Sequence, residues 1–173
     1  MYARILAGTF AAISFFVAPA FAGEKTTDVV KPAFSLSLPG EWSLISEPAD
    51  DFWQYQSKDG REGVSISIYS RPGTSDKNSI RPDFDRFLAA QRRAETNIKD
   101  TPMEVGETKI TDEKGVLYGL HAGVSLDGKH RTVTRIAMSQ NIAISLFYEV
   151  QGMDEDESIL RATNALFSLE LQK

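Results

Sequence analysis

Two histidines are the residues of this chain best suited to metal ligation or proton transfer, and their placement favours neither. His121 and His130 lie nine residues apart, and the strand pairing that we favour below puts them on opposite faces of one sheet, so they cannot bind the same ion. The chain has no cysteine, no His-Glu-x-x-His helix and no Asp-x-Asp-x-Asp-Gly calcium loop. We therefore expect no metal site and no cofactor.

Patterns for nucleophilic catalysis are also absent from the sequence. A catalytic serine on a sharp turn is usually marked by Gly-x-Ser-x-Gly, which does not occur here, and the glycines fall singly rather than in phosphate-binding loops. The 24 acidic residues are numerous, but a pair of catalytic acids is recognised only by its geometry. We expect no catalytic residues, and a hydrolase that uses carboxylates stays as the alternative.

A predicted hairpin around Asp127-Gly128 decides where the basic residues lie. A two-residue turn would pair Val124 with Arg131 and Leu120 with Arg135, which directs both arginines toward the apolar face. A three-residue turn, with Gly128 as the bulge, pairs Ser125 with Lys129 and keeps the arginines off the core, so we prefer it. The same argument at Gln140 predicts two further pairs, Ile136 with Ile144 and Met138 with Ile142.

This register predicts a cationic patch on an acidic protein. His121, Arg131 and Arg135 would share the sheet face opposite the core, and we take them as candidates for binding a partner. Trp53 is a fourth candidate, because it alternates with Phe52 and one of the two should point away from a core on one side. The aromatic residues Trp42, Trp53, Tyr55 and Tyr69 could instead line a pocket, as in a small-ligand carrier.

The densest run of charge is acidic and covers residues 154–157. Acids at the start of a helix accept hydrogen bonds from free backbone amides and complement the helix dipole. We prefer this structural interpretation to a divalent-cation site or an acidic docking surface.

The beginning of the chain has the order of a secretory signal. Arg4 is followed by an uncharged apolar run, Pro19 and the small-x-small site Ala20-Phe21-Ala22. We predict a signal peptide at 1–22, cleaved after Ala22, and a soluble periplasmic product without a membrane anchor. The formal charge of −5 and the isoelectric point near 5.1 argue against binding nucleic acid.

Alternating apolar residues and two amphipathic stretches predict the fold class. We expect an α+β single domain with one twisted antiparallel β-sheet of about 6–8 strands and two α-helices packed on it. A flexible arm is expected at 23–32, and the domain covers 33–173. The first helix carries the apolar stripe Phe84, Phe87, Leu88, Gln91 and Ala94, and the second, at 154–166, the stripe Ile159, Leu160, Ala162, Thr163 and Leu166.

The stretch from Phe34 to Trp42, Phe-Ser-Leu-Ser-Leu-Pro-Gly-Glu-Trp, resembles the opening strand and Pro-x-x-Trp turn of the PsbP-like, Mog-type α+β superfamily, here its bacterial periplasmic DcrB-like branch. The order of elements over 33–171 is also similar, down to the closing Ser168-Leu169-Glu170-Leu171. The resemblance implies a non-enzymatic adaptor, chaperone or binding subunit, since the superfamily shares no catalytic motif.

These observations together predict an exported, non-enzymatic binding or adaptor protein of the periplasm. It would act through protein–protein contacts on a sheet face, with another protein of the periplasm or envelope as its partner. A toxin-immunity or secretion-associated role is a special case, in which an acidic inhibitor suits a basic toxin. The alternatives are the carboxylate hydrolase and the small-ligand carrier.

Overall fold

Eleven strands and two helices make up the computed structural model, which describes residues 25–49, 51–71, 80–98 and 101–171. The expected signal peptide at 1–22 lies outside the described residues. Within those residues, no helix has the length and apolar character that a membrane crossing requires. The elements are β1 Thr26–Lys31, β2 Phe34–Pro39, β3 Trp42–Ala49, β4 Phe52–Ser57, β5 Glu62–Ser70, α1 Ile80–Thr96, β6 Met103–Val105, β7 Lys109–Glu113, β8 Val116–Ser125, β9 His130–Met138, β10 Ile142–Gln151, α2 Glu155–Phe167 and β11 Glu170–Leu171.

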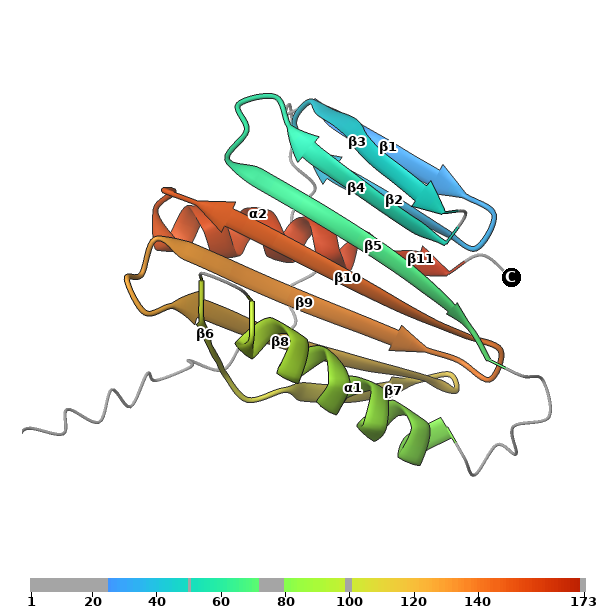
Figure 1. Cartoon of the computed structure of the whole chain (residues 1–173). Helices are drawn as coiled ribbons and strands as arrows, with labels where there is room; N and C mark the ends of the chain where they lie inside the picture. Colours follow the sequence, from blue (N-terminus) through green and yellow to red (C-terminus); the bar gives the residue numbers. More distant parts are fainter. Residues whose placement is uncertain (1–24, 50, 72–79, 99–100, 172–173) are drawn as a thin grey trace, which may run out of the picture.

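The elements are arranged in three layers around an eight-stranded antiparallel sheet. Its strands follow the order β3-β4-β5-β10-β9-β8-β6, and β7 also pairs with β8. Helix α1 covers part of the front face, whereas α2 and a small sheet of β1, β2 and β11 cover the back (Figure 1). The predicted α+β single domain with two packed helices is confirmed, and a second sheet is added to it.

The first strand corrects the expectation of a flexible arm at 23–32. β1 pairs with β2 without interruption from Thr26↔Pro39 to Lys31↔Phe34. Only Val29 of β1 is fully buried, so the segment has no alternating apolar pattern that a sequence could reveal. The hydroxyl of Thr27 fixes the strand further, because it donates to the Gly40 carbonyl (2.9 Å) and accepts from the Trp42 amide (3.0 Å).

The predicted register of the central hairpin is wrong by one residue. Val124 pairs with Arg131 and Leu120 with Arg135, which is the pairing of the two-residue turn. The next hairpin is shifted likewise, since Met138 pairs with Ala143 rather than with Ile142. The prediction assumed one covered face, but helices cover both faces of this part of the sheet, so arginines that point to the back face still reach carbonyls at the two ends of α2.

The buried faces of the two helices also differ from the predicted stripes. In α1, Phe84 and Leu88 are buried as expected, but Ala94 is exposed and Glu95 takes the inward position. In α2, Ala162 and Leu166 are buried, whereas Ile159 and Leu160 are exposed. The remaining inward side chains of α2 are mostly small or polar: Ser158, Arg161 and Ala165.

Two glycines on β8 let α1 lie close to the sheet. A Cβ at Gly119 would stand 2.9 Å from Phe84 Cζ, and one at Gly123 would stand 2.9 Å from Glu95 Oε1. Both distances are shorter than a side chain tolerates. The glycines therefore set the depth at which Phe84 and Glu95 enter the front core.

A buried polar cluster joins α2 to the back of the sheet. The Arg161 guanidinium donates from Nε to Glu62 Oε1 (2.9 Å) and from Nη2 to Glu62 Oε2 (2.8 Å), and Nη2 also donates to the Pro39 carbonyl (2.9 Å). The Tyr148 hydroxyl donates to Glu62 as well. The Trp42 indole donates to the same Pro39 carbonyl (2.9 Å). The Pro-x-x-Trp turn is thus held by the helix that closes the fold.

Replacing Arg161 with methionine should destabilise the protein strongly. Glu62 is almost fully buried, and an unpaired buried carboxylate costs about 3–5 kcal/mol. The matched control is Arg81→Met, because Arg81 forms an exposed pair with Asp85 and such pairs contribute little. The free energy of unfolding in urea checks both variants. Equal losses would show that the cluster does not support the fold.

Stability should also depend on Tyr148 at alkaline pH. Burial raises the pKa of the Tyr148 phenol above its ordinary 10.0, and the nearby Glu62 carboxylate, the second largest cause, raises it further. The unfolded chain then releases this proton as pH rises above about 10 while the folded chain keeps it, so stability is retained below that pH and lost above it. Urea unfolding between about pH 9 and about pH 11 should show a shallower decline for Tyr148→Phe. Identical declines would contradict the assignment.

Candidate functional site

The structure does not form the predicted cationic patch. His121 lies on the front face, with its side chain fully buried, whereas Arg131 and Arg135 lie on the back face beside α2. Trp53 is also not an exposed contact, because it is only 4% exposed and packs edge-to-face on Phe34 in the back core. The one-residue error in register separates the first three, and the small sheet on the back covers the fourth.

The two arginines instead hold the ends of α2. Arg131 donates to the Met153 carbonyl (3.3 Å), just before the helix begins. Arg135 donates to the Leu166 carbonyl, and its guanidinium lies between the rings of Tyr118 (4.8 Å) and Phe167 (4.9 Å). Burial lowers the pKa of this guanidinium from its ordinary value. Because α2 has no basic residue in its last turn, Arg135 supplies the positive charge that a helix C-terminus favours.

His121 belongs to a buried network around Glu95 of α1. His121 Nε2 lies 2.7 Å from Glu95 Oε2, the Thr134 hydroxyl donates to the same oxygen (3.2 Å), and the Thr132 hydroxyl donates to Oε1. A fully buried imidazole cannot touch a substrate, so this network fastens α1 to β8 and β9. This network could not be predicted from the sequence, because Glu95 comes one residue after Ala94, the last residue of the predicted apolar stripe.

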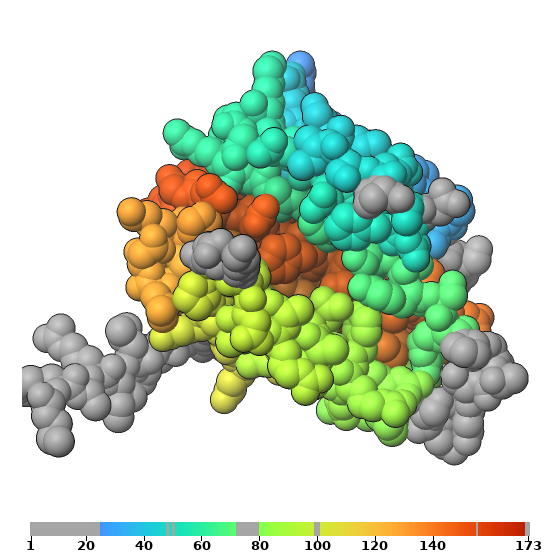
Figure 2. Space-filling model, viewed as in Figure 1, coloured from blue at the N-terminus to red at the C-terminus, as the bar shows by residue number. Residues whose placement is uncertain are grey.

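The front face of the sheet is covered only in part. Helix α1 lies mainly over β6, β8 and β9. It also reaches Ala143 and Ser145 of β10 and Tyr69 of β5, so the half left open beside it consists of β4 and the adjoining parts of β5 and β10. Figure 2 shows this half as a hollow between α1 and the strands above it, with β10 at its floor. The pairing places uncharged side chains, some polar and some apolar, in two rows that run across it toward the strands under α1. One row runs Gln54, Ser65, Phe147 and Thr134, and the next runs Phe52, Ser67, Ser145 and Ile136.

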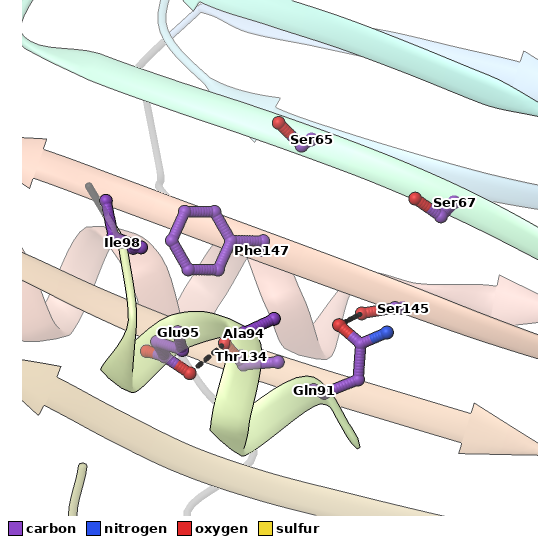
Figure 3. A pocket seen from close by; sticks show the side chains of 9 residues that line it. All are labelled: Ser65, Ser67, Gln91, Ala94, Glu95, Ile98, Thr134, Ser145 and Phe147. Atoms are coloured by element: carbon purple, nitrogen blue, oxygen red, sulfur yellow. Dashed lines mark hydrogen bonds between the residues drawn. The ribbon is translucent and has the colours of Figure 1, made fainter. Parts of the chain in front are cut away.

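A groove of about 240 Å³ lies where this open half meets α1. Ser65, Ser67, Ser145 and Phe147 point into it from the strands, and Gln91, Ala94 and Ile98 face them from the helix and its end (Figure 3). The Ser145 hydroxyl donates to Gln91 Oε1 (3.3 Å), which links floor and wall. Glu95 is the one ionisable side chain of the lining, and its two oxygens already accept the hydrogen bonds described above. Apart from Glu95 the lining is uncharged, so the groove is suited to binding by hydrogen bonds and apolar contact.

The carboxylates do not form a pair across this groove. Among the described residues, the two buried carboxylates are Glu62 and Glu95, and they lie on opposite faces of the sheet, each with its own partners. The acidic run at 154–157 behaves as a helix start, since Asp154 accepts from the Asp156 amide (3.0 Å). In the described part of the chain, no three His, Asp or Glu side chains gather in a way that would hold a metal ion.

Removing the Glu95 carboxylate should weaken the fold. Glu95→Ala leaves His121, Thr132 and Thr134 buried without their partner, and each orphaned group costs about 1–3 kcal/mol. Glu95→Gln should be milder, because an amide oxygen still accepts. Glu104→Ala, at an exposed position on the neighbouring β6, is the control. The free energy of unfolding in urea checks the three variants. If Glu95→Ala were as stable as the Glu104→Ala control, the network would not stabilise the packing of α1.

Comparison with known proteins identifies the fold. No family model matches the chain, and no curated protein matches its sequence. Among solved structures, the solution structure of cyanobacterial PsbP (CyanoP) from Synechocystis matches with a TM-score of 0.61 at 15% identity, covering 94% of this chain and 100% of that one. LpqN of Mycobacterium tuberculosis, described as involved in cell envelope biogenesis, matches with a TM-score of 0.52 at 15% identity, covering 87% and 92%. The chain therefore has a PsbP-like fold.

Proposed function

We propose that this chain is an exported, non-enzymatic binding or adaptor protein of the periplasm or cell envelope, cleaved after Ala22. Its partner is another protein, which docks on the open half of the front sheet face and reaches into the groove. The DcrB-like branch of the Mog-type superfamily is the finer assignment within this proposal. A toxin-immunity or secretion-associated role is its narrower form.

The observation that carries this proposal is the incomplete cover of the front face. α1 leaves β4 and the adjoining parts of β5 and β10 open, a width of about 10 Å or more at the usual strand spacing, and this width accommodates a further element from another protein. The exposed surface mixes two half-buried rings, Phe52 and Phe147, with hydroxyl and amide groups. Rings that anchor a partner among adaptable polar groups are typical of polar protein interfaces.

The edges of the eight-stranded sheet favour contact through a face. β6 has only three residues, and β3 has two irregularities in its pairing with β4. Short and irregular edge strands are the usual means by which proteins prevent another strand from adding to a sheet. In the groove itself, β5 and β10 pair without interruption, so a partner is recognised there by side chains.

Two further observations support the proposal without depending on the groove. The N-terminal sequence pattern is that of an exported protein, and LpqN, which has a similar fold, is described as involved in cell envelope biogenesis. The buried carboxylates are also occupied by structural partners, which favours binding over hydrolysis.

Blocking the groove should abolish partner binding without unfolding the protein. Ser67→Arg puts a long charged side chain on the groove floor, and Thr26→Arg puts the same side chain on an exposed strand of the small sheet. A photo-cross-linking residue at Ala94, on the groove wall, should capture a defined envelope protein in living cells. Ser67→Arg should reduce this capture about tenfold or more.

The controls separate a lost partner from a lost fold. Thr26→Arg should leave the cross-link at Ala94 unchanged, and both arginine variants should unfold at urea concentrations close to that of the unmodified chain. The assignment of the groove as the docking site would be contradicted by a cross-link at Ala94 that persists in Ser67→Arg. It would also be contradicted if the photo-cross-linking residue, moved from position 94 to position 26, captured the same protein equally well.

A further inference from the structure

Large apolar side chains lie on the outside of α2, where a surface helix usually carries polar ones. Ile159, Leu160 and Phe167 are 42%, 54% and 44% exposed. Leu160 and Phe167 are seven residues apart, which places them on one side of the helix two turns from each other. The inward side of α2 instead carries small residues such as Ser158, Ala162 and Ala165.

The charge on the same helix has one sign at its surface. Asp154, Asp156 and Glu157 are exposed at its beginning, and Glu170 is exposed after its end. Arg161, the one basic residue of α2, points inward to Glu62. Capping explains Asp154 and the helix dipole favours its neighbours, but neither accounts for three exposed apolar side chains beside them.

We propose that Ile159, Leu160 and Phe167, with Asp156 and Glu157, form a second docking surface, which we call the α2 surface. Its occupant is a segment of a partner protein that carries an apolar ridge flanked by lysine or arginine. Apolar contact supplies the driving force for association, and the acids select a cationic flank and speed its approach. This inference stands independently of the groove on the front face.

Two other occupants fit the α2 surface less well. An anionic membrane would repel the exposed acids. A second copy of this chain lacks a complementary charge, because antiparallel pairing of two α2 helices brings the acidic start of one to the end of the other, where the last turn has no basic residue.

A peptide probe tests the proposal on the full exported chain. The probe is a short amphipathic helix made of leucine and lysine, and its counterpart carries glutamate in place of each lysine. Fluorescence anisotropy should show binding of the lysine probe, weakened by salt, and no binding of the glutamate probe. No binding of the lysine probe, or equal binding of both, would overturn the proposal.

Variants then locate the binding. The double variant Ile159→Ser, Leu160→Ser should lower the affinity for the lysine probe about tenfold or more. The matched control is Val30→Ser, Leu126→Ser, which removes two exposed apolar side chains elsewhere and should change nothing. Asp156→Asn with Glu157→Gln should weaken binding and flatten its salt dependence. Phe167 is left unchanged because it also stacks on Arg135.

The remaining outcomes are equally decisive. Binding that survives the double serine variant would place the probe elsewhere and overturn the α2 surface. A dimer in sedimentation that the double variant dissociates would identify a second copy as the occupant instead. Ser67→Arg should leave binding of the lysine probe intact, so a failure at the groove and a failure at the α2 surface remain distinguishable.

Discussion

One buried carboxylate determines how the back of the molecule is assembled. Glu62 of β5 receives both Arg161 of α2 and Tyr148 of β10, and Arg161 continues to the Pro39 carbonyl at the β2–β3 turn. Because this arginine must point inward, the rotation of α2 about its axis is fixed. Leu166 and three small residues, Ser158, Ala162 and Ala165, then face the core, and Ile159 and Leu160 lie on the outer side. The exposed apolar stripe is therefore a consequence of a buried ion pair.

Elements with a strict period could be predicted from the sequence, as β2 and α1 show. Phe34, Leu36 and Leu38 alternate and are all buried, and the predicted stripe that begins at Phe84 lies on a helix that extends to Thr96. β1 could not be predicted, because one buried valine makes no pattern. The positions of Ile159 and Leu160 could not be predicted either, since the distant Glu62 sets the rotation of α2.

The predicted cationic patch depended on the register of the β8–β9 hairpin. That register was chosen on the assumption that only one face of the sheet is covered. Arg131 and Arg135 would be unfavourable on an apolar face covered by other strands. Beside α2 they are well placed, because the Met153 carbonyl before the helix and the Leu166 carbonyl in its last turn accept their hydrogen bonds. A sheet covered on both sides has no face reserved for charge, so alternation alone cannot choose between the two turns. The groove was missed for a related reason: serines on alternate positions look solvent-facing whether or not a helix edge stands beside them.

The two proposed surfaces lie on opposite sides of the same sheet, and the strands between them are shared. Thr134 lines the groove on the front of β9, and the next residue, Arg135, supports the end of α2 on the back. A rigid, fully paired strand keeps these two positions apart while holding both in place. A partner at the groove would approach the front of the sheet, and a partner at the α2 surface would approach the back. Occupying one surface would therefore leave the other free, and two partners bound at the two proposed surfaces would not compete for the same layer of the fold.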